Sequence, residues 1–182
     1  MTTRTYDEEK KCWVLICKGT VGAPFSIAHF KKVRDNMEED MKKLTSKHFE
    51  PYVLESIPGV DRVLLTNINL PFPMSNRTFM NCLYFCDVDG STYWQASSSK
   101  DTDELVQQHK DKIKKNVIGT NHMNFTLVKD TEDGVEWSGV VMSDMGGSFP
   151  SVAIKKMSEE QAKESHGRIY FMLTGEPMIK KK

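Results

Sequence analysis

The alternation of apolar and polar positions divides the chain into an early helix, a run of strands and a long final helix. Apolar residues recur at steps of three and four between Phe30 and Leu44, which predicts an amphipathic helix over residues 22–44 with Pro24 in its first turn. A final helix is predicted from about residue 149 to 173. β-rich runs bounded by turn residues predict seven strands, at 11–18, 51–57, 60–68, 78–88, 91–98, 116–128 and 135–145. This order predicts an α+β fold in which the last helix covers one face of a curved antiparallel sheet.

The sequence pattern of segment 101–115 is compatible with either a helix or a loop. Its apolar stripe is thin, and helix is favoured over loop. Asp101 and Glu104 have the spacing of a capping box, which would start such a helix.

Short turns predict which side chains share a face of the sheet. Asp89-Gly90 is typical of a two-residue hairpin turn, which would place Leu83 opposite Ala96. Symmetric pairing around Pro58-Gly59 and around the TEDG turn extends an apolar face across the sheet. With Val152 of the final helix, the side chains predicted to line the interior are Tyr52, Leu54, Val63, Leu65, Phe79, Asn81, Leu83, Phe85, Trp94, Ala96, Met123, Phe125, Val140 and Met142. The residues predicted to supply polar contacts there are Asn81, Ser98 and Asn121. From the pattern alone, such a face is more typical of a packed core than of a ligand cavity.

The adjacent glycines Gly146 and Gly147 lie between the last strand and the final helix. A glycine-rich turn at a helix start often cradles phosphate, but a phosphate loop expects a parallel βαβ unit with Lys-Ser or Lys-Thr after the glycines. Here the preceding strand belongs to a hairpin, and Phe149-Pro150 follows. We therefore expect the glycines to form a sharp corner, with Pro150 in the first turn of the helix.

Composition and charge narrow the classes of function. Basic and acidic residues number 25 each, which argues against a nucleic-acid partner, because such proteins need a basic surface. The polar N-terminus has no apolar signal region, and we expect a cytoplasmic protein with reduced cysteines. The four cysteines, spaced C-x4-C and C-x3-C in strand-like runs, predict buried apolar side chains and no metal site.

Two motifs resemble those of a known family. LPFPMSNRTFMN (70–81) is similar to the P-x-S-x-R-D-F motif of START domains, the lipid-transfer domains related to steroidogenic acute regulatory protein. SDMGGSFP (143–150) resembles that family's D-x-G-G-x-L/I-P motif before its C-terminal helix. The residues that match, carried over as structural ones, are Arg77, Asp144, Gly146, Gly147 and Pro150. Thr78 departs from the motif, and Leu83 occupies a position where some members carry an internal arginine.

The resemblance implies the helix-grip fold, shared with the birch pollen allergen superfamily. In that fold a seven-stranded sheet would grip the final helix around a hydrophobic tunnel. The implied partner is one lipid, a sterol, phospholipid or fatty acid, held for transfer or sensing with transient contact to a membrane surface. Neither a cofactor nor a catalytic residue is implied. We expect one START-like domain over residues 1–182, with loose termini at 1–10 and 175–182.

Two other functions remain open at this point. Some helix-grip proteins are cyclases or hydrolases, and such chemistry needs a histidine or carboxylate in the cavity. Only His122 lies within a predicted strand, and the predicted register turns it outward. The other alternative is a protein-interaction module with a filled core and no ligand.

Overall fold

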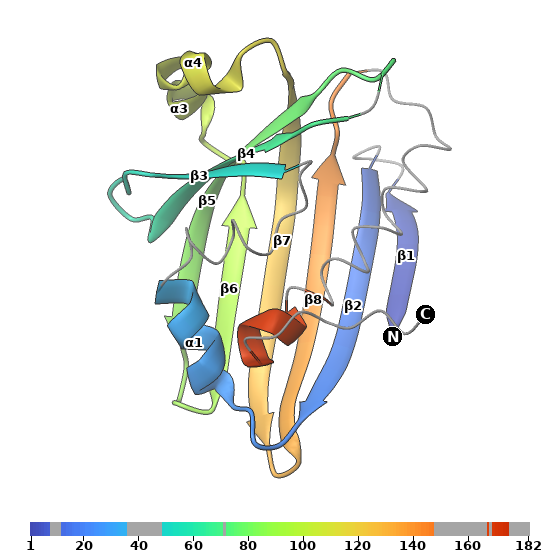
Figure 1. Cartoon of the computed structure of the whole chain (residues 1–182), viewed down its shortest axis with the longest axis vertical. Helices are drawn as coiled ribbons and strands as arrows, with labels where there is room; N and C mark the ends of the chain where they lie inside the picture. The colour runs from blue at the N-terminus through green and yellow to red at the C-terminus, as the bar shows by residue number, and fades with distance from the viewer. Residues whose placement is uncertain (8–11, 36–48, 71, 148–166, 168, 175–182) are drawn as a thin grey trace.

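One curved sheet dominates the structure. A computed structural model describes residues 1–7, 12–35, 49–70, 72–147, 167 and 169–174. Within these ranges the strands are β1 (Thr2–Asp7), β2 (Cys12–Gly22), β3 (Phe49–Leu54), β4 (Arg62–Ile68), β5 (Arg77–Asp87), β6 (Thr92–Ser98), β7 (Val117–Thr131) and β8 (Gly134–Asp144). They form an eight-stranded sheet in the order β1-β2-β8-β7-β6-β5-β4-β3, which confirms the predicted α+β class (Figure 1). Neighbours along this order are antiparallel, and the start of β5 also pairs in parallel with the start of β7.

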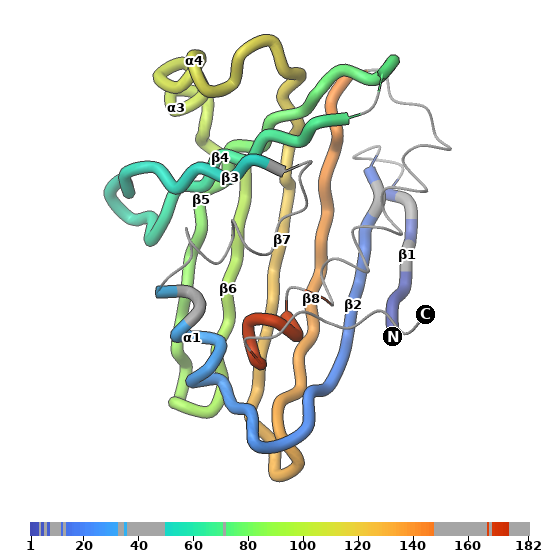
Figure 2. The backbone as a smooth tube through the Cα atoms, viewed as in Figure 1, coloured from blue at the N-terminus to red at the C-terminus, as the bar shows by residue number. Residues whose placement is uncertain are grey.

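The sheet curls at one end. In Figure 2, the backbones of β3 and β4 run at a steep angle to those of β6, β7 and β8. The helix α1 (Ile27–Asp35) and the helical residues 169–174 lie on the same side of the sheet (Figure 1). We call this side the inner face and the opposite side the outer face.

An apolar cluster fills the inner face at the α1 end of the sheet. Phe30 of α1 and Leu173 of the C-terminal helical segment are both fully buried in it. The Phe30 and Tyr93 rings pack with centroids 5.4 Å apart. The sheet residues of this inner cluster are Leu15, Cys17, Tyr93, Val128, Val135 and Trp137.

A second apolar cluster lies on the outer face, beneath the short helices α3 (Asp103–Gln108) and α4 (Lys110–Ile113). Leu105 and Ile113 of these helices pack against Val63, Leu65, Met80 and Cys82. A buried polar group fixes α4 to the sheet, because Asn67 Nδ2 donates to the Lys112 carbonyl at 2.9 Å. The prediction of helix over loop in segment 101–115 is therefore confirmed for these two short elements.

Several expected boundaries were wrong. The first ten residues were expected to be loose, but Thr2–Asp7 pairs with β2 as an eighth, polar edge strand. The first helix starts at Ile27, where the Asp130 carboxylate accepts the Ile27 N–H at 2.8 Å, so Pro24 precedes it. Asp101 and Glu104 form no capping box, because the N-cap residue of α3 is Thr102 and no side chain caps it. The expected final helix lies outside the described residues between 148 and 166.

The predicted registers had different outcomes. Around Pro58-Gly59 the register is confirmed, with Tyr52 opposite Leu65 and Leu54 opposite Val63. Around TEDG it is also confirmed, since Phe125 pairs with Val140 and Met123 with Met142.

At Asp89-Gly90 the predicted register was wrong by one residue. Leu83 lies opposite Ser97 and Tyr84 opposite Ala96. The carboxylates of Asp87 and Asp89 accept the N–H groups of Gly90 and Ser91 at 2.8 and 2.9 Å, which stabilises a loop longer than two residues. A one-residue slip turns every β6 side chain to the other face.

Candidate functional site

Polar side chains cross the middle of the inner face, next to the inner apolar cluster. They come from four adjacent strands, β5 to β8, and from the residue that follows β6. We call this set the inner polar band: Asn81, Gln95, Ser97, Ser99, Asn121, Asn124, Thr126 and Ser143. Cross-strand pairing places its members side by side, for example Ser97 beside Asn124 and Gln95 beside Thr126.

Asn121 is the centre of the hydrogen bonding in this band. It is buried, and its Nδ2 donates to Ser97 Oγ at 3.2 Å. Its Oδ1 accepts from Ser143 Oγ at 3.1 Å, and its backbone N–H donates to Ser99 Oγ at 3.0 Å. Ser99 Oγ in turn donates to Asn81 Oδ1 at 3.2 Å. These bonds fix one end of the band as a preformed, rigid polar group.

A β-bulge turns Asn121 inward. The pairing between β7 and β8 shifts by one residue between Asn121 and Met123, so His122 is the extra residue. Without the shift, strict alternation would place Asn121 on the face opposite Thr126. His122 Nε2 is buried and has no hydrogen-bond partner in the described part of the chain.

Gln95 differs from the rest of the band. It lies between Phe85 of β5 and Thr126 of β7 in the cross-strand row. Its Oε1 atom is buried, and no donor reaches it from the described residues. A buried acceptor without a donor costs on the order of 1–3 kcal/mol. Such a group is therefore a candidate contact for a bound molecule.

Gly139 continues the row of Gln95 and Thr126 on β8. An added Cβ at Gly139 would meet nothing closer than the Phe125 carbonyl oxygen at 3.4 Å. At Gly19 and Gly119, by contrast, the rings of Trp137 and Phe79 cover the backbone at 2.6 and 2.5 Å from an added Cβ. Among the described residues, the Gly139 backbone beside Thr126 is therefore less closely covered than the other inner-face glycines, Gly19 and Gly119, which lie under aromatic rings.

The structure divides the predicted lining residues between three places. Phe85 packs against the inner cluster, and side chains alternate along β5. Four of the predicted residues therefore lie on the inner face: Phe79, Asn81, Leu83 and Phe85. Tyr52, Leu54, Val63 and Leu65 belong to the outer cluster beneath α3 and α4. On the outer face lie Trp94, Ala96, Met123, Phe125, Val140 and Met142. Val152 and Pro150 lie outside the described residues.

The prediction that these residues share a single apolar face was therefore wrong. Trp94 and Phe125 stack with ring centroids 5.9 Å apart on the outer face, and Met123 is 48% exposed there. Ser98, predicted as a polar contact, shares the face of Cys82, whereas Asn81 and Asn121 belong to the inner polar band. The partners that sequence reasoning missed are Gln95, Ser97, Ser99, Asn124, Thr126 and Ser143.

The two sequence motifs meet at a buried arginine. Arg77 is 3% exposed, and its Nε donates to the Met145 carbonyl at 2.6 Å, while Nη2 donates to the Gly146 carbonyl at 3.3 Å. Nη1 donates to the Ser75 carbonyl. Burial lowers the pKa of the Arg77 guanidinium from its usual value. Asp144 supports the same corner, since its Oδ1 accepts the Gly146 N–H at 2.8 Å.

Both glycines of the corner have left-handed backbones, with φ of +70° at Gly146 and +64° at Gly147. An added Cβ at Gly146 would lie 2.2 Å from the Ile118 carbonyl oxygen. The need for glycine here is therefore conformational and steric. The helix start that this corner was expected to introduce lies outside the described residues.

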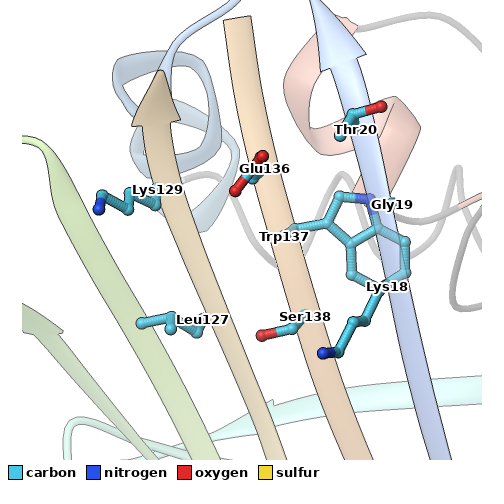
Figure 3. Close-up of a pocket in the computed structure, with 8 residues that line it drawn as sticks. All are labelled: Lys18, Gly19, Thr20, Leu127, Lys129, Glu136, Trp137 and Ser138. Atoms are coloured by element: carbon cyan, nitrogen blue, oxygen red, sulfur yellow. The ribbon is translucent and has the colours of Figure 1, made fainter.

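A pocket of about 430 Å³ lies on the outer face (Figure 3). Its outward side chains come from three strands. Lys18 of β2 pairs with Ser138 of β8, and Lys129 of β7 pairs with Glu136 of β8. In Figure 3 the Trp137 indole lies over Gly19, which agrees with their close approach. Because its polar side chains point away from the inner face, this pocket is separate from the predicted tunnel.

No group of three or more His, Cys, Asp or Glu side chains within these ranges is placed to hold a metal ion. None of the helices in the described part of the chain has the length and apolar character that a bilayer crossing needs.

Comparison with known proteins identifies the fold. No protein-family model and no curated sequence matches this chain. Human STARD10 superposes with a TM-score of 0.70 at 16% identity, over 94% of this chain and 72% of that one. The chain has the fold of a START domain. Human StAR-related lipid transfer protein 5 gives a TM-score of 0.67 at 12% identity, over 96% and 81% of the two chains. A STAR-related lipid transfer protein from Xanthomonas axonopodis gives 0.61 at 13% identity, over 96% and 97%. The helix-grip architecture implied by the two motifs is thereby confirmed.

Proposed function

We propose that this START-fold protein binds one lipid molecule on the inner face of its sheet, for lipid transfer or sensing. The observation that carries the proposal is the inner polar band, in which Asn121 bonds to several neighbouring side chains, next to a buried apolar cluster. Ligand sites in proteins combine mostly apolar walls with a few placed polar groups. The START fold supports the same function, because the similar structures are named as lipid transfer proteins.

The proposed site uses each part of the inner face differently. The apolar cluster around Tyr93 and Trp137 would contact the hydrocarbon part of the ligand, and the polar band would contact its polar end. Leu83 and Phe85 of β5 lie opposite Ser97 and Gln95 and would line the site together with Phe79. Loading from a bilayer requires transient contact with a membrane surface, which we include in the proposal.

The test is direct binding of lipids by the full chain. Fluorescent sterol, fatty acid and phospholipid analogues are titrated into purified protein, and molecules that copurify are extracted and identified by mass spectrometry. Saturable binding of one molecule per chain supports the proposal. If no lipid class binds and none copurifies, the protein is an interaction module with a filled core.

One observation favours an enzyme as the second candidate. His122 is a titratable side chain at a bulge in β7, and its Nε2 is buried without a partner in the described residues. General acid–base catalysis would use such a nitrogen. Recovery of an added ligand after incubation separates the two functions, because a binder releases it chemically unchanged. The His122→Gln variant would abolish turnover if His122 were catalytic.

A further inference from the structure

Within the proposed function, we infer that the bound molecule is an uncharged lipid alcohol whose hydroxyl donates a hydrogen bond to Gln95 Oε1. This inference deepens the proposed function and rests on it. It names the polar end of the ligand and the residue that selects it.

The inner polar band contains one buried oxygen that accepts no hydrogen bond from the described residues. Asn121 uses its Nδ2, Oδ1 and backbone N–H within the band, and the Asn81 oxygen accepts from Ser99. These groups already satisfy one another. Gln95 Oε1, in contrast, is buried and receives no donor from the described residues. The acceptor that a ligand would satisfy is therefore the Gln95 amide.

The inner polar band carries no formal charge. All eight side chains of the inner polar band are uncharged. Arg77, a buried cation on the same strand as Asn81, directs its guanidinium to the backbone carbonyls of Ser75, Met145 and Gly146. A phosphate or carboxylate brought beside Gln95 would lose hydration without an opposite charge from these groups. The described site therefore favours a neutral polar end.

Among neutral polar groups, a hydroxyl suits the Gln95 amide best. A hydroxyl both donates and accepts, so it satisfies a glutamine amide in either orientation of its oxygen and nitrogen. An ether, ester or ketone oxygen only accepts and would leave Oε1 without a donor. Gly139, two strands from Gln95 in the same cross-strand row, adds no side chain of its own to the inner face. A hydroxyl on an apolar skeleton would supply the one donor that Gln95 Oε1 needs, and its skeleton would contact the neighbouring apolar cluster.

The experiment compares matched probes on the full chain. The ring series is cholesterol, its 3-O-methyl ether and cholesteryl sulfate, and the linear series is hexadecan-1-ol, its methyl ether and palmitate at pH 8. We expect the alcohol of at least one series to bind roughly tenfold more tightly than its methyl ether, the change that one neutral hydrogen bond produces. The charged member should bind more weakly still.

Two variants separate Gln95 from general effects. Gln95→Met keeps the length of the side chain and removes the acceptor, so the preference for the alcohol over the ether should disappear. Gln107→Met makes the same change at an exposed residue of α3 and should leave the preference intact. Because the probe comparison is made first on the unaltered chain, it gives an answer even if Gln95→Met fails to fold.

The outcomes distinguish this inference from the proposed function. If lipids bind but alcohol, ether and anion bind equally, or if Gln95→Met keeps the preference, the inference is wrong and the proposed function stands. If no probe binds and no lipid copurifies, the proposed function and the inference are both wrong.

Discussion

Arg77 Nε and the Met145 carbonyl oxygen are 2.6 Å apart, although 68 residues separate them in the sequence. This hydrogen bond joins the start of β5 to the corner that follows β8. It explains why both motifs carry their polar residues where they do: the arginine of the first motif satisfies the carbonyls exposed by the glycine corner of the second. The corner is thus held by a side chain from the middle of the chain.

Loss of the arginine should destabilise the fold. Arg77→Met removes several hydrogen bonds to backbone carbonyls and leaves these buried acceptors without donors. We expect the free energy of unfolding to fall by about 3 kcal/mol. Urea denaturation followed by circular dichroism measures the change. Arg62→Met, at an exposed arginine on β4, is the control and should cost less than about 0.5 kcal/mol. Equal effects at the two arginines would contradict the role assigned to Arg77.

The two corner glycines should differ in their response to alanine. Both substitutions carry the cost of a side chain at positive φ, about 1 kcal/mol. Gly146→Ala also drives a Cβ to 2.2 Å from the Ile118 carbonyl oxygen, whereas at Gly147 the contact is 3.6 Å from Val117 Cγ1. We expect Gly146→Ala to be the more damaging by about 2 kcal/mol or more in thermal unfolding. A larger effect at Gly147 would show that the corner is built differently.

Neighbouring residues on β5 test the assignment of faces. Leu83 is 7% exposed on the inner face, and Tyr84, on the outer face, is 36% exposed. Leu83 lies between Arg62 and Ser97 in the cross-strand row. A glutamate at position 83 would place a charge within the proposed lipid site, so Leu83→Glu should reduce lipid affinity at least tenfold. Tyr84→Glu should leave affinity within about twofold. Circular dichroism first establishes that both variants fold. Normal binding by a folded Leu83→Glu, with loss in Tyr84→Glu, would mean that the two faces are exchanged.

Buried thiols predict a dependence of stability on alkaline pH. Burial raises the pKa of the Cys17 and Cys82 thiols, because it disfavours the thiolate. A thiol with a raised pKa contributes stability that is fully present below its unfolded-state pKa of about 8.5 and is lost as pH rises through the folded-state value. The urea midpoint should therefore fall as the pH rises above about 8.5. The Cys17→Ala, Cys82→Ala double variant should show a smaller fall, and an unchanged pH dependence would contradict this cause.

Sequence patterns were sufficient to predict most strands and the fold. The hairpins at Pro58-Gly59 and TEDG have the predicted pairing, since their turn residues lie between strands of clear β character. The Asp89-Gly90 register failed because bonds from Asp87 and Asp89 to loop amides stabilise a longer loop, and turn type alone does not show this. The edge strand Thr2–Asp7 was missed because its polar residues lack the apolar alternation of a half-buried strand.

The candidate site was harder to predict, for a physical reason. The prediction from hydrophobicity placed Phe125 and Met142 on the inner face, because an apolar face is ordinarily the buried one. In this protein the inner face carries Gln95, Thr126 and Asn121 in its middle, so the contrast between faces is reduced there. Asn121 faces inward only through the bulge at His122, which no local signal in the sequence indicated. Such departures from apolar patterning are expected at a functional site.

Native mass spectrometry of the freshly purified full chain tests the central claim most directly. The account predicts a fraction of molecules with one added small-molecule mass per chain, released on denaturation and identifiable as lipid. Gly139→Phe, which places a ring beside Thr126 on the inner face in the cross-strand row of Gln95, should lose this adduct, whereas Ser138→Phe on the outer face should keep it. Bare protein in every preparation, with no adduct after incubation with any lipid class, would contradict the claim that this START-fold protein binds a lipid on the inner face of its sheet.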